Sequence, residues 1–156
     1  MCGVRDILPR QIRALMFYYV EPEVAGGLGD GAVMDTAVNP PLVSELEYEF
    51  SGWLGDELLE SFPCFVVTKN LAAALMRYQF TGFVLDAVVV TKTEEFNIIH
   101  PSTILPGFHW LKVHGVAGVS DFGIAQDCRL VVSEVALGVI RGCRFDHADV
   151  EVYSKA

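Results

Sequence analysis

Apolar and polar residues alternate most regularly over residues 44–50. The apolar residues Leu46, Tyr48 and Phe50 alternate with Glu45, Glu47 and Glu49. Because successive side chains of a strand point to opposite faces, this segment is predicted to be a half-buried strand with a row of carboxylates on its solvent face. Charged side chains discourage edge-to-edge pairing, so the strand is expected at the edge of a sheet.

Further segments are rich in β-branched and aromatic residues, which pack well on a pleated sheet. Strands are therefore predicted over residues 15–20, 64–68, 82–91, 108–114, 128–132 and 147–153. In the third of these segments, Phe83, Leu85, Ala87 and Val89 lie at every second position and are expected to share one face.

Two helices are predicted where a hydroxyl residue precedes an amphipathic run. Thr68 is the expected N-cap of a helix over residues 69–79, and Ser133 is the expected N-cap of a helix that ends near Arg141. In each case the side-chain oxygen can accept a hydrogen bond from a free N–H group of the first turn. Gly142 follows the second helix, at the position where a glycine commonly ends one.

A third, shorter helix is predicted over residues 55–61, with Asp56 as its N-cap and Pro63 after its end. Turn residues dominate the remaining segments, which are predicted to be loops over residues 21–41, 93–106 and 115–127. Strands outnumber helices and their order is irregular. The predicted fold class is therefore α+β, with a largely antiparallel or mixed sheet and two or three short helices.

The composition indicates one folded domain. The 156 residues are 52% hydrophobic, and a chain of this length can build a core without disulfides or metals. No apolar run approaches the roughly 18 residues of a membrane helix, and residues 1–15 lack the apolar core of a secretory signal. The four cysteines show no CxxC spacing and are expected to be reduced thiols. We therefore expect a cytoplasmic protein with no membrane partner and no cofactor.

The net charge of −9 is concentrated in one third of the chain. No lysine or arginine occurs between Ala14 and Thr68. The same stretch carries these acidic residues: Glu21, Glu23, Asp30, Asp35, Glu45, Glu47, Glu49, Asp56, Glu57 and Glu60. Phosphate binding needs clustered cations, so nucleic acid is not expected as a partner. The acidic stretch is either a solubilising face or a docking surface for a basic protein.

One glycine pattern matches a nucleotide-binding fingerprint only in form. Gly27, Gly29 and Ala32 have the spacing of the relaxed dinucleotide motif, which requires a helix directly after the turn to meet the pyrophosphate. Here turn residues follow instead, and the carboxylates of Asp30 and Asp35 would repel phosphate. A structural glycine-rich loop is the favoured interpretation.

No arrangement of reactive residues indicates a catalytic or metal site. His147, Asp149 and Glu151 share a predicted strand face and could form a metal-binding or acid–base row, but a solvent face near the chain end explains them more simply. His109 and His114 are five positions apart on a predicted strand and therefore face opposite ways. No nucleophile motif is present around any serine or cysteine.

Besides binding of a basic protein, two classes of function are compatible with the sequence. A small hydrolase or ligand-binding enzyme would use carboxylates such as Asp30 and Asp35, the row at 147–151, or glycosidase-type pairs among the acids of residues 45–60. An oligomeric structural module is the other class, because the high apolar content is compatible with a homodimer.

Trp53 lies between Gly52 and Gly55 and is flanked by two acidic segments. A tryptophan in this setting is either an anchor in the core, which is the favoured interpretation, or a hot spot of an interface, where tryptophan is enriched. An acidic surround would suit a basic partner surface.

The stretches FHWLKV, DFG, LVVSEVAL and HADVE follow one another between residues 108 and 151. Together with VAGGLGDGAVMDTAVNPP and YEFSGWLGDELLESFPCFVVT, they resemble the small bacterial immunity proteins of polymorphic toxin systems, of the myxobacterial type. The resemblance runs from about Met16 to Tyr153. Related chains would begin near Met16, so residues 1–15 are expected to be a peripheral extension and residues 16–156 a single domain.

The resemblance implies a cytoplasmic inhibitor that binds and neutralises a toxin domain. It supplies no functional residues, so the expected contacts come from charge and aromatic placement alone. The residues expected to bind the partner are Glu45, Glu47, Glu49, Trp53, Asp56, Glu57 and Glu60.

Overall fold

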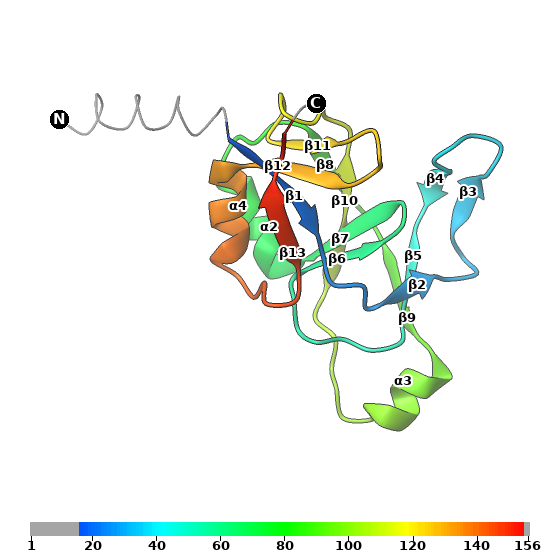
Figure 1. Ribbon diagram of the computed structural model, residues 1–156. Helices are drawn as coiled ribbons and strands as arrows, with labels where there is room; N and C mark the ends of the chain where they lie inside the picture. Colours follow the sequence, from blue (N-terminus) through cyan, green and yellow to red (C-terminus); the bar gives the residue numbers. More distant parts are fainter. Residues whose placement is uncertain (1–15, 155–156) are drawn as a thin grey trace.

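The computed structural model describes residues 16–154, and Figure 1 shows the arrangement of the elements. The predicted α+β class is confirmed: within the described residues, short helices accompany several antiparallel and mixed sheets. The helices are α2 (Lys69–Met76), α3 (Glu94–Ile99) and α4 (Glu134–Arg141). The strands are β1 (Phe17–Glu21), β2 (Gly26–Leu28), β3 (Val33–Asp35), β4 (Leu42–Glu45), β5 (Glu47–Phe50), β6 (Leu58–Ser61), β7 (Cys64–Thr68), β8 (Phe83–Asp86), β9 (Val89–Lys92), β10 (Phe108–Val113), β11 (Phe122–Ile124), β12 (Leu130–Ser133) and β13 (Asp149–Val152).

Two four-stranded antiparallel sheets, β11-β12-β1-β13 and β6-β7-β10-β8, form the larger part of the fold. Each sends a strand directly into a helix, β12 into α4 and β7 into α2, and the two helices pack against each other beside these sheets (Figure 1). Side chains of both sheets and both helices meet in the first core, which includes Val20, Leu71, Leu111 and Ile140.

A second core lies on the other face of the β6-β7-β10-β8 sheet, against the small mixed sheet β2-β5-β9. Strand β7 is buried along its whole length because Phe65 and Val67 point into the first core while Cys64 and Val66 point into the second. The predicted strand over 64–68 is thus confirmed, and its continuous apolar run reflects burial on both faces.

The alternation over residues 44–50 is confirmed, but the expected edge position is wrong. Tyr48 and Phe50 are fully buried in the second core, and the glutamates face away from it. Strand β5 is nevertheless the central strand of its sheet, with β2 antiparallel on one side and β9 parallel on the other. The charged row marks the exposed face of the sheet rather than its edge.

The predicted strand over 82–91 is two strands in different sheets. Strand β8 pairs with β10, and after Asp86 the chain crosses to pair β9 with β5. The side-chain alternation is reset at the crossing, so Phe83 and Leu85 pack on the first core while Val89 is exposed. An apolar run does not reveal which of two sheets a strand joins.

Four other predicted segments also differ, and one of them is the predicted loop over 115–127, which contains strand β11. Residues 55–61 form no helix, because residues 58–61 pair with β7 as strand β6 and bury Leu58 and Leu59 on opposite faces. The predicted loop over 21–41 contains β2 and β3, and the predicted loop over 93–106 contains α3, which is capped by Thr93.

The two predicted helix caps are confirmed. The side chain of Thr68 accepts from Leu71 N, and that of Ser133 accepts from Ala136 N. Helix α2 ends at Met76, earlier than predicted. Gly142 caps the end of α4 with right-handed helical backbone angles, so this helix end does not use the left-handed conformation for which glycine is usually selected.

Between residues 16 and 154, no helix has both the length and the apolar character needed to cross a bilayer. Cys64, Cys128 and Cys143 are free thiols, in agreement with the expectation for these three. The expected N-terminal extension, residues 1–15, lies outside the described residues.

Candidate functional site

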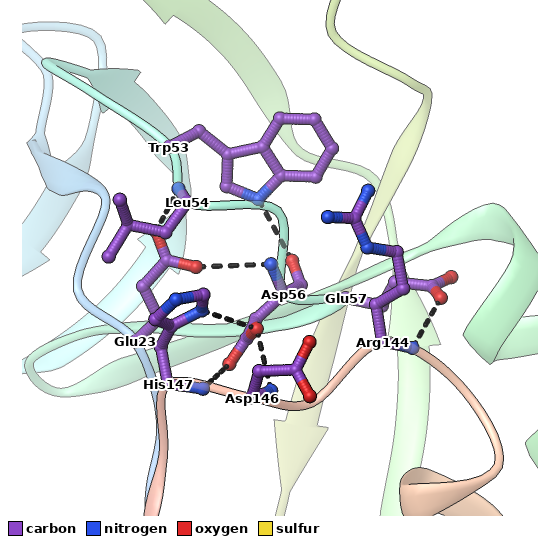
Figure 2. Close-up of polar contacts among 8 residues, drawn as sticks. All are labelled: Glu23, Trp53, Leu54, Asp56, Glu57, Arg144, Asp146 and His147. Carbon is purple, nitrogen blue, oxygen red and sulfur yellow. Dashed lines mark hydrogen bonds and ion pairs between the residues drawn. The ribbon is translucent and has the colours of Figure 1, made fainter.

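Asp56 lies in the loop between β5 and β6 and is almost completely buried, with an exposed fraction of 1%. Its carboxylate accepts hydrogen bonds from Asp146 N at 2.9 Å, from His147 N at 2.8 Å and from His147 Nδ1 at 3.0 Å (Figure 2). The side chain thus ties this loop to the segment between α4 and β13, 90 positions further along the chain.

Glu23, between β1 and β2, is buried beside Asp56. Its carboxylate accepts from Leu54 N at 2.6 Å and from Asp56 N at 3.1 Å (Figure 2). The backbone carbonyl of Glu23 accepts from Glu60 N. Glu23 therefore holds the backbone of the loop that carries Asp56. We call Glu23, Asp56 and His147 the carboxylate latch, because together they join three segments that are distant in sequence.

Glu57 makes a second, parallel connection. Its carboxylate accepts from Thr68 Oγ1 at 2.6 Å, Asn70 Nδ2 at 3.0 Å and Arg144 N at 2.8 Å. Burial alone would raise the pKa of Glu57, but these hydrogen bonds stabilise the ionised form and the pKa lies below its usual value. Glu57 thus joins the start of α2 to the segment after α4 as an ionised carboxylate.

Trp53 packs into the structure rather than facing solvent. Its Nε1 donates to the carbonyl of Asp56 at 2.9 Å, and its ring meets Phe108 edge-on with centroids 6.2 Å apart. It lies half-buried against the second core. Nearby, Gly55 has a φ of +110°, and a Cβ there would collide with the guanidinium of Arg144. These contacts favour the core-anchor interpretation of Trp53.

The latch does not fit a metal ion. One ligand atom from each of Glu23, Asp56 and His147 lies within 4.8 Å of the others. However, both oxygens of each carboxylate already accept backbone N–H groups, and Nδ1 of His147 is bonded to Asp56. Among the described residues, no buried side-chain polar atom lacks a hydrogen-bond partner. Both carboxylates are therefore engaged in holding the backbone, and Nδ1 of His147 is engaged with Asp56.

The side chains of His147, Asp149 and Glu151 do not form one metal-binding or acid–base site. His147 bonds to Asp56, and this hydrogen bond raises the pKa of the imidazole. Glu151 instead pairs with Arg129 at 2.7 Å, and Asp149 is exposed. The three side chains therefore have separate surroundings and share no ligand or substrate position.

The glycine-rich loop holds a carboxylate of the chain itself. Oε1 of Glu47 accepts from Gly31 N at 2.7 Å, and Oε2 accepts from Thr91 Oγ1 at 2.7 Å. A Cβ at Gly29 or Gly31 would collide with the side chain of Glu47. No helix follows the loop, since β3 begins at Val33. The loop is thus structural, and the nucleotide-binding geometry is not formed.

Glu47 also fixes the direction of a projecting hairpin. One antiparallel ribbon is formed by β2 and β3 on one side and by β5 and β4 on the other. This ribbon bends at residues 29–32. Figure 1 shows that the β3–β4 end of this ribbon extends away from the rest of the protein. The hydrogen bonds of Glu47 to Gly31 and Thr91 hold the bend from which it projects.

Residues 30–45, which we call the acidic hairpin, are almost entirely exposed. The apolar side chains of Val33, Val38 and Leu42 are 48%, 47% and 66% exposed. Asp30, Asp35 and Glu45 are also exposed, and the hairpin contains no lysine or arginine. The hairpin thus presents exposed apolar side chains, and all of its charged side chains are carboxylates.

The residues expected to bind a partner are divided by the structure into three groups. Glu45 belongs to the acidic hairpin, and Glu47 and Glu49 lie half-buried on the outer face of β5 beside it. Trp53 and Glu60 are half-buried, and burial together with the charge of Glu21 raises the pKa of Glu60 to about 7. Asp56 and Glu57 are buried, with their oxygens engaged in hydrogen bonds, and present no surface to a partner.

Residues that the sequence analysis missed lie in or just after the segment predicted to be a loop, residues 21–41. Val33, Met34, Val38 and Leu42 provide the exposed apolar surface of the acidic hairpin. The signal that was available is that these four large apolar side chains, with Val43, occur among turn residues, small residues and acids. No family model, curated protein or solved structure matches this chain.

Proposed function

We propose that this protein binds a basic protein partner through the acidic hairpin. The observation that carries the proposal is the exposure of Val33, Val38 and Leu42 on a projecting ribbon whose charged side chains are all carboxylates. Apolar side chains gathered on an exposed surface and rimmed by polar residues are typical of docking surfaces.

The hairpin is poorly explained by the stability of the fold. A two-stranded hairpin is marginal by itself and normally gains stability by packing an apolar face. Here Val43 is the residue of β3 and β4 that packs against the second core, while Val33, Met34 and Leu42 remain exposed. Their burial against a partner would supply the apolar centre of an interface, with the carboxylates as its polar rim.

The negative charge of the hairpin determines which kind of protein it attracts. A surface of one sign accelerates association with an oppositely charged protein and disfavours acidic ones. Asp30, Asp35 and Glu45 lie on the hairpin, and Glu49 continues the negative surface along β5. The partner is therefore a protein with a basic surface that also carries an apolar contact area.

In line with the resemblance to immunity proteins, we propose that the protein is a cytoplasmic inhibitor whose partner is the toxin domain of a polymorphic toxin system. In that setting the hairpin covers a basic surface of the toxin and blocks access to its active site. The contact set is narrower than the sequence alone implied, because Asp56 and Glu57 stabilise the fold instead of facing the partner.

Growth protection tests this proposal. The protein is co-expressed with the C-terminal domain encoded by the gene just upstream of its own, and survival is scored. A double variant, Asp30→Lys with Glu45→Lys, is expected to lose protection, because it reverses the charge of the hairpin at two exposed positions.

The matched control reverses two exposed acids elsewhere, Glu95→Lys with Asp149→Lys, so that the net charge changes equally. This control is expected to protect as well as the wild type. Equal loss of protection in both variants would remove the hairpin as the docking site. Failure of the wild type to protect against that domain would argue against the inhibitor proposal itself.

A further inference from the structure

Helices α2 and α4 enclose a polar groove on the side of the protein away from the acidic hairpin (Figure 1). Asn70, at the start of α2, contacts Cys143, just after the end of α4, with Nδ2 and Sγ 3.8 Å apart. The start of one helix therefore lies beside the end of the other, so the two helices run antiparallel. The groove between them has a volume of about 770 Å³.

Two arginines line this groove, Arg77 at the end of α2 and Arg141 at the end of α4. Neither takes part in an ion pair within residues 16–154. Two guanidinium groups free of ion pairs among the described residues thus line one groove.

The helix geometry directs both arginines over the groove floor. Side chains on a helix lean toward its N-terminus, over the preceding turn. Arg77 therefore leans over Ala74 and Arg141 over Gly138, and all four residues line the groove. Because the helices run antiparallel, this tendency is expected to bring the two guanidinium groups toward each other from opposite ends of the groove.

Gly138 leaves the groove floor open. Glycine within a helix is unfavourable relative to alanine, yet a Cβ at Gly138 would meet no other atom within 4 Å. The packing of the protein therefore gives no reason for a glycine at this position. The position therefore adds no side chain to the lining of the groove.

We propose that the α2–α4 groove binds a small anion bearing phosphate or carboxylate groups, held between Arg77 and Arg141. Guanidinium groups form paired hydrogen bonds with both kinds of group, and a convergent pair is the arrangement that holds them. The groove volume lies within the range of small-molecule sites. Glu134 lines the groove at the start of α4, and the ionised Glu57 accepts from Asn70 at the other end, so the anionic group is expected between the two arginines rather than at either end. This site is independent of the acidic hairpin.

Calorimetric titration of the full chain with pyrophosphate and with citrate tests the proposal and separates the two chemistries. Saturable binding of one ligand per chain is expected for at least one of them. Arg77→Gln or Arg141→Gln should each weaken that binding by about tenfold or more, the usual loss when a charged hydrogen-bond partner is removed.

Gly138→Leu should abolish binding by filling the floor, and circular dichroism verifies that the variant is folded. Lys92→Gln is the matched control, since it removes one exposed positive charge from β9 and should leave binding unchanged. The proposal is overturned if neither anion binds saturably. It is equally overturned if Arg77→Gln and Arg141→Gln each bind as tightly as the wild type, or if binding survives in folded Gly138→Leu.

Discussion

Replacing Asp56 with alanine removes the central member of the carboxylate latch. The carboxylate is 1% exposed and accepts hydrogen bonds from the backbone of Asp146 and His147 and from the imidazole of His147. The change leaves two backbone donors without partners and frees the loop after α4 from the loop before β6.

The magnitude follows from these two donors. A buried donor that loses its partner costs roughly 1–3 kcal/mol, so two of them cost roughly 2–6 kcal/mol. Asp146 and His147 are exposed residues, so water can replace part of the lost bonding. We therefore expect a loss of about 3 kcal/mol in the free energy of unfolding, which corresponds to roughly 6–12 °C in Tm for a chain of this size.

Urea denaturation and thermal melting, both followed by circular dichroism, measure this loss. The matched control is Asp30→Ala, which removes the same charge from an exposed position and should change stability by less than about 0.5 kcal/mol. If the two variants are equally stable, Asp56 does not hold the fold together and the latch is wrongly assigned.

Three further changes test the local geometry. The folded-state pKa of His147 is raised, so the stability that it contributes is present below the unfolded pKa of about 6.5 and is lost as the pH rises through the folded pKa. The difference in stability between wild type and His147→Ala should therefore shrink as the pH rises above the folded pKa. A difference that stays constant with pH would contradict the ion pair with Asp56. Glu47→Ala should speed amide hydrogen exchange across residues 29–45, because it releases the bend of the ribbon, and equal exchange in Glu47→Ala and Glu49→Ala would show that Glu47 does not fix the hairpin. Gly55→Ala should lower Tm markedly more than Gly52→Ala, because Gly55 has a positive φ and faces Arg144 while a Cβ at Gly52 meets nothing.

Local patterns in the sequence predicted local structure well. The alternation over 44–50 follows from burial on one face of a strand, and the caps at Thr68 and Ser133 depend only on residues within the next turn. The latch could not be predicted in this way. Asp56 followed by Glu57 is typical of a helix start, but the donors that Asp56 binds lie 90 and 91 positions away. Burial of a carboxylate depends on partners that the tertiary fold supplies.

The acidic hairpin shows a different limit. Its strands are three and four residues long, and their side chains are mostly exposed, so neither alternation nor an apolar run marks them. The charge pattern of the sequence did indicate an acidic region and a basic partner. It could not separate Glu45, which is exposed, from Asp56 and Glu57, which are buried.

The central claim is that the acidic hairpin docks a basic partner, and the most direct test is the rate of association. Biolayer interferometry with the purified C-terminal domain that the upstream gene encodes, the proposed partner, gives this rate at several salt concentrations. We predict fast association that slows as salt is raised, and Asp30→Lys with Glu45→Lys should slow it at low salt and flatten the salt dependence. Association rates that are the same in wild type and in this variant at every salt concentration would contradict the claim.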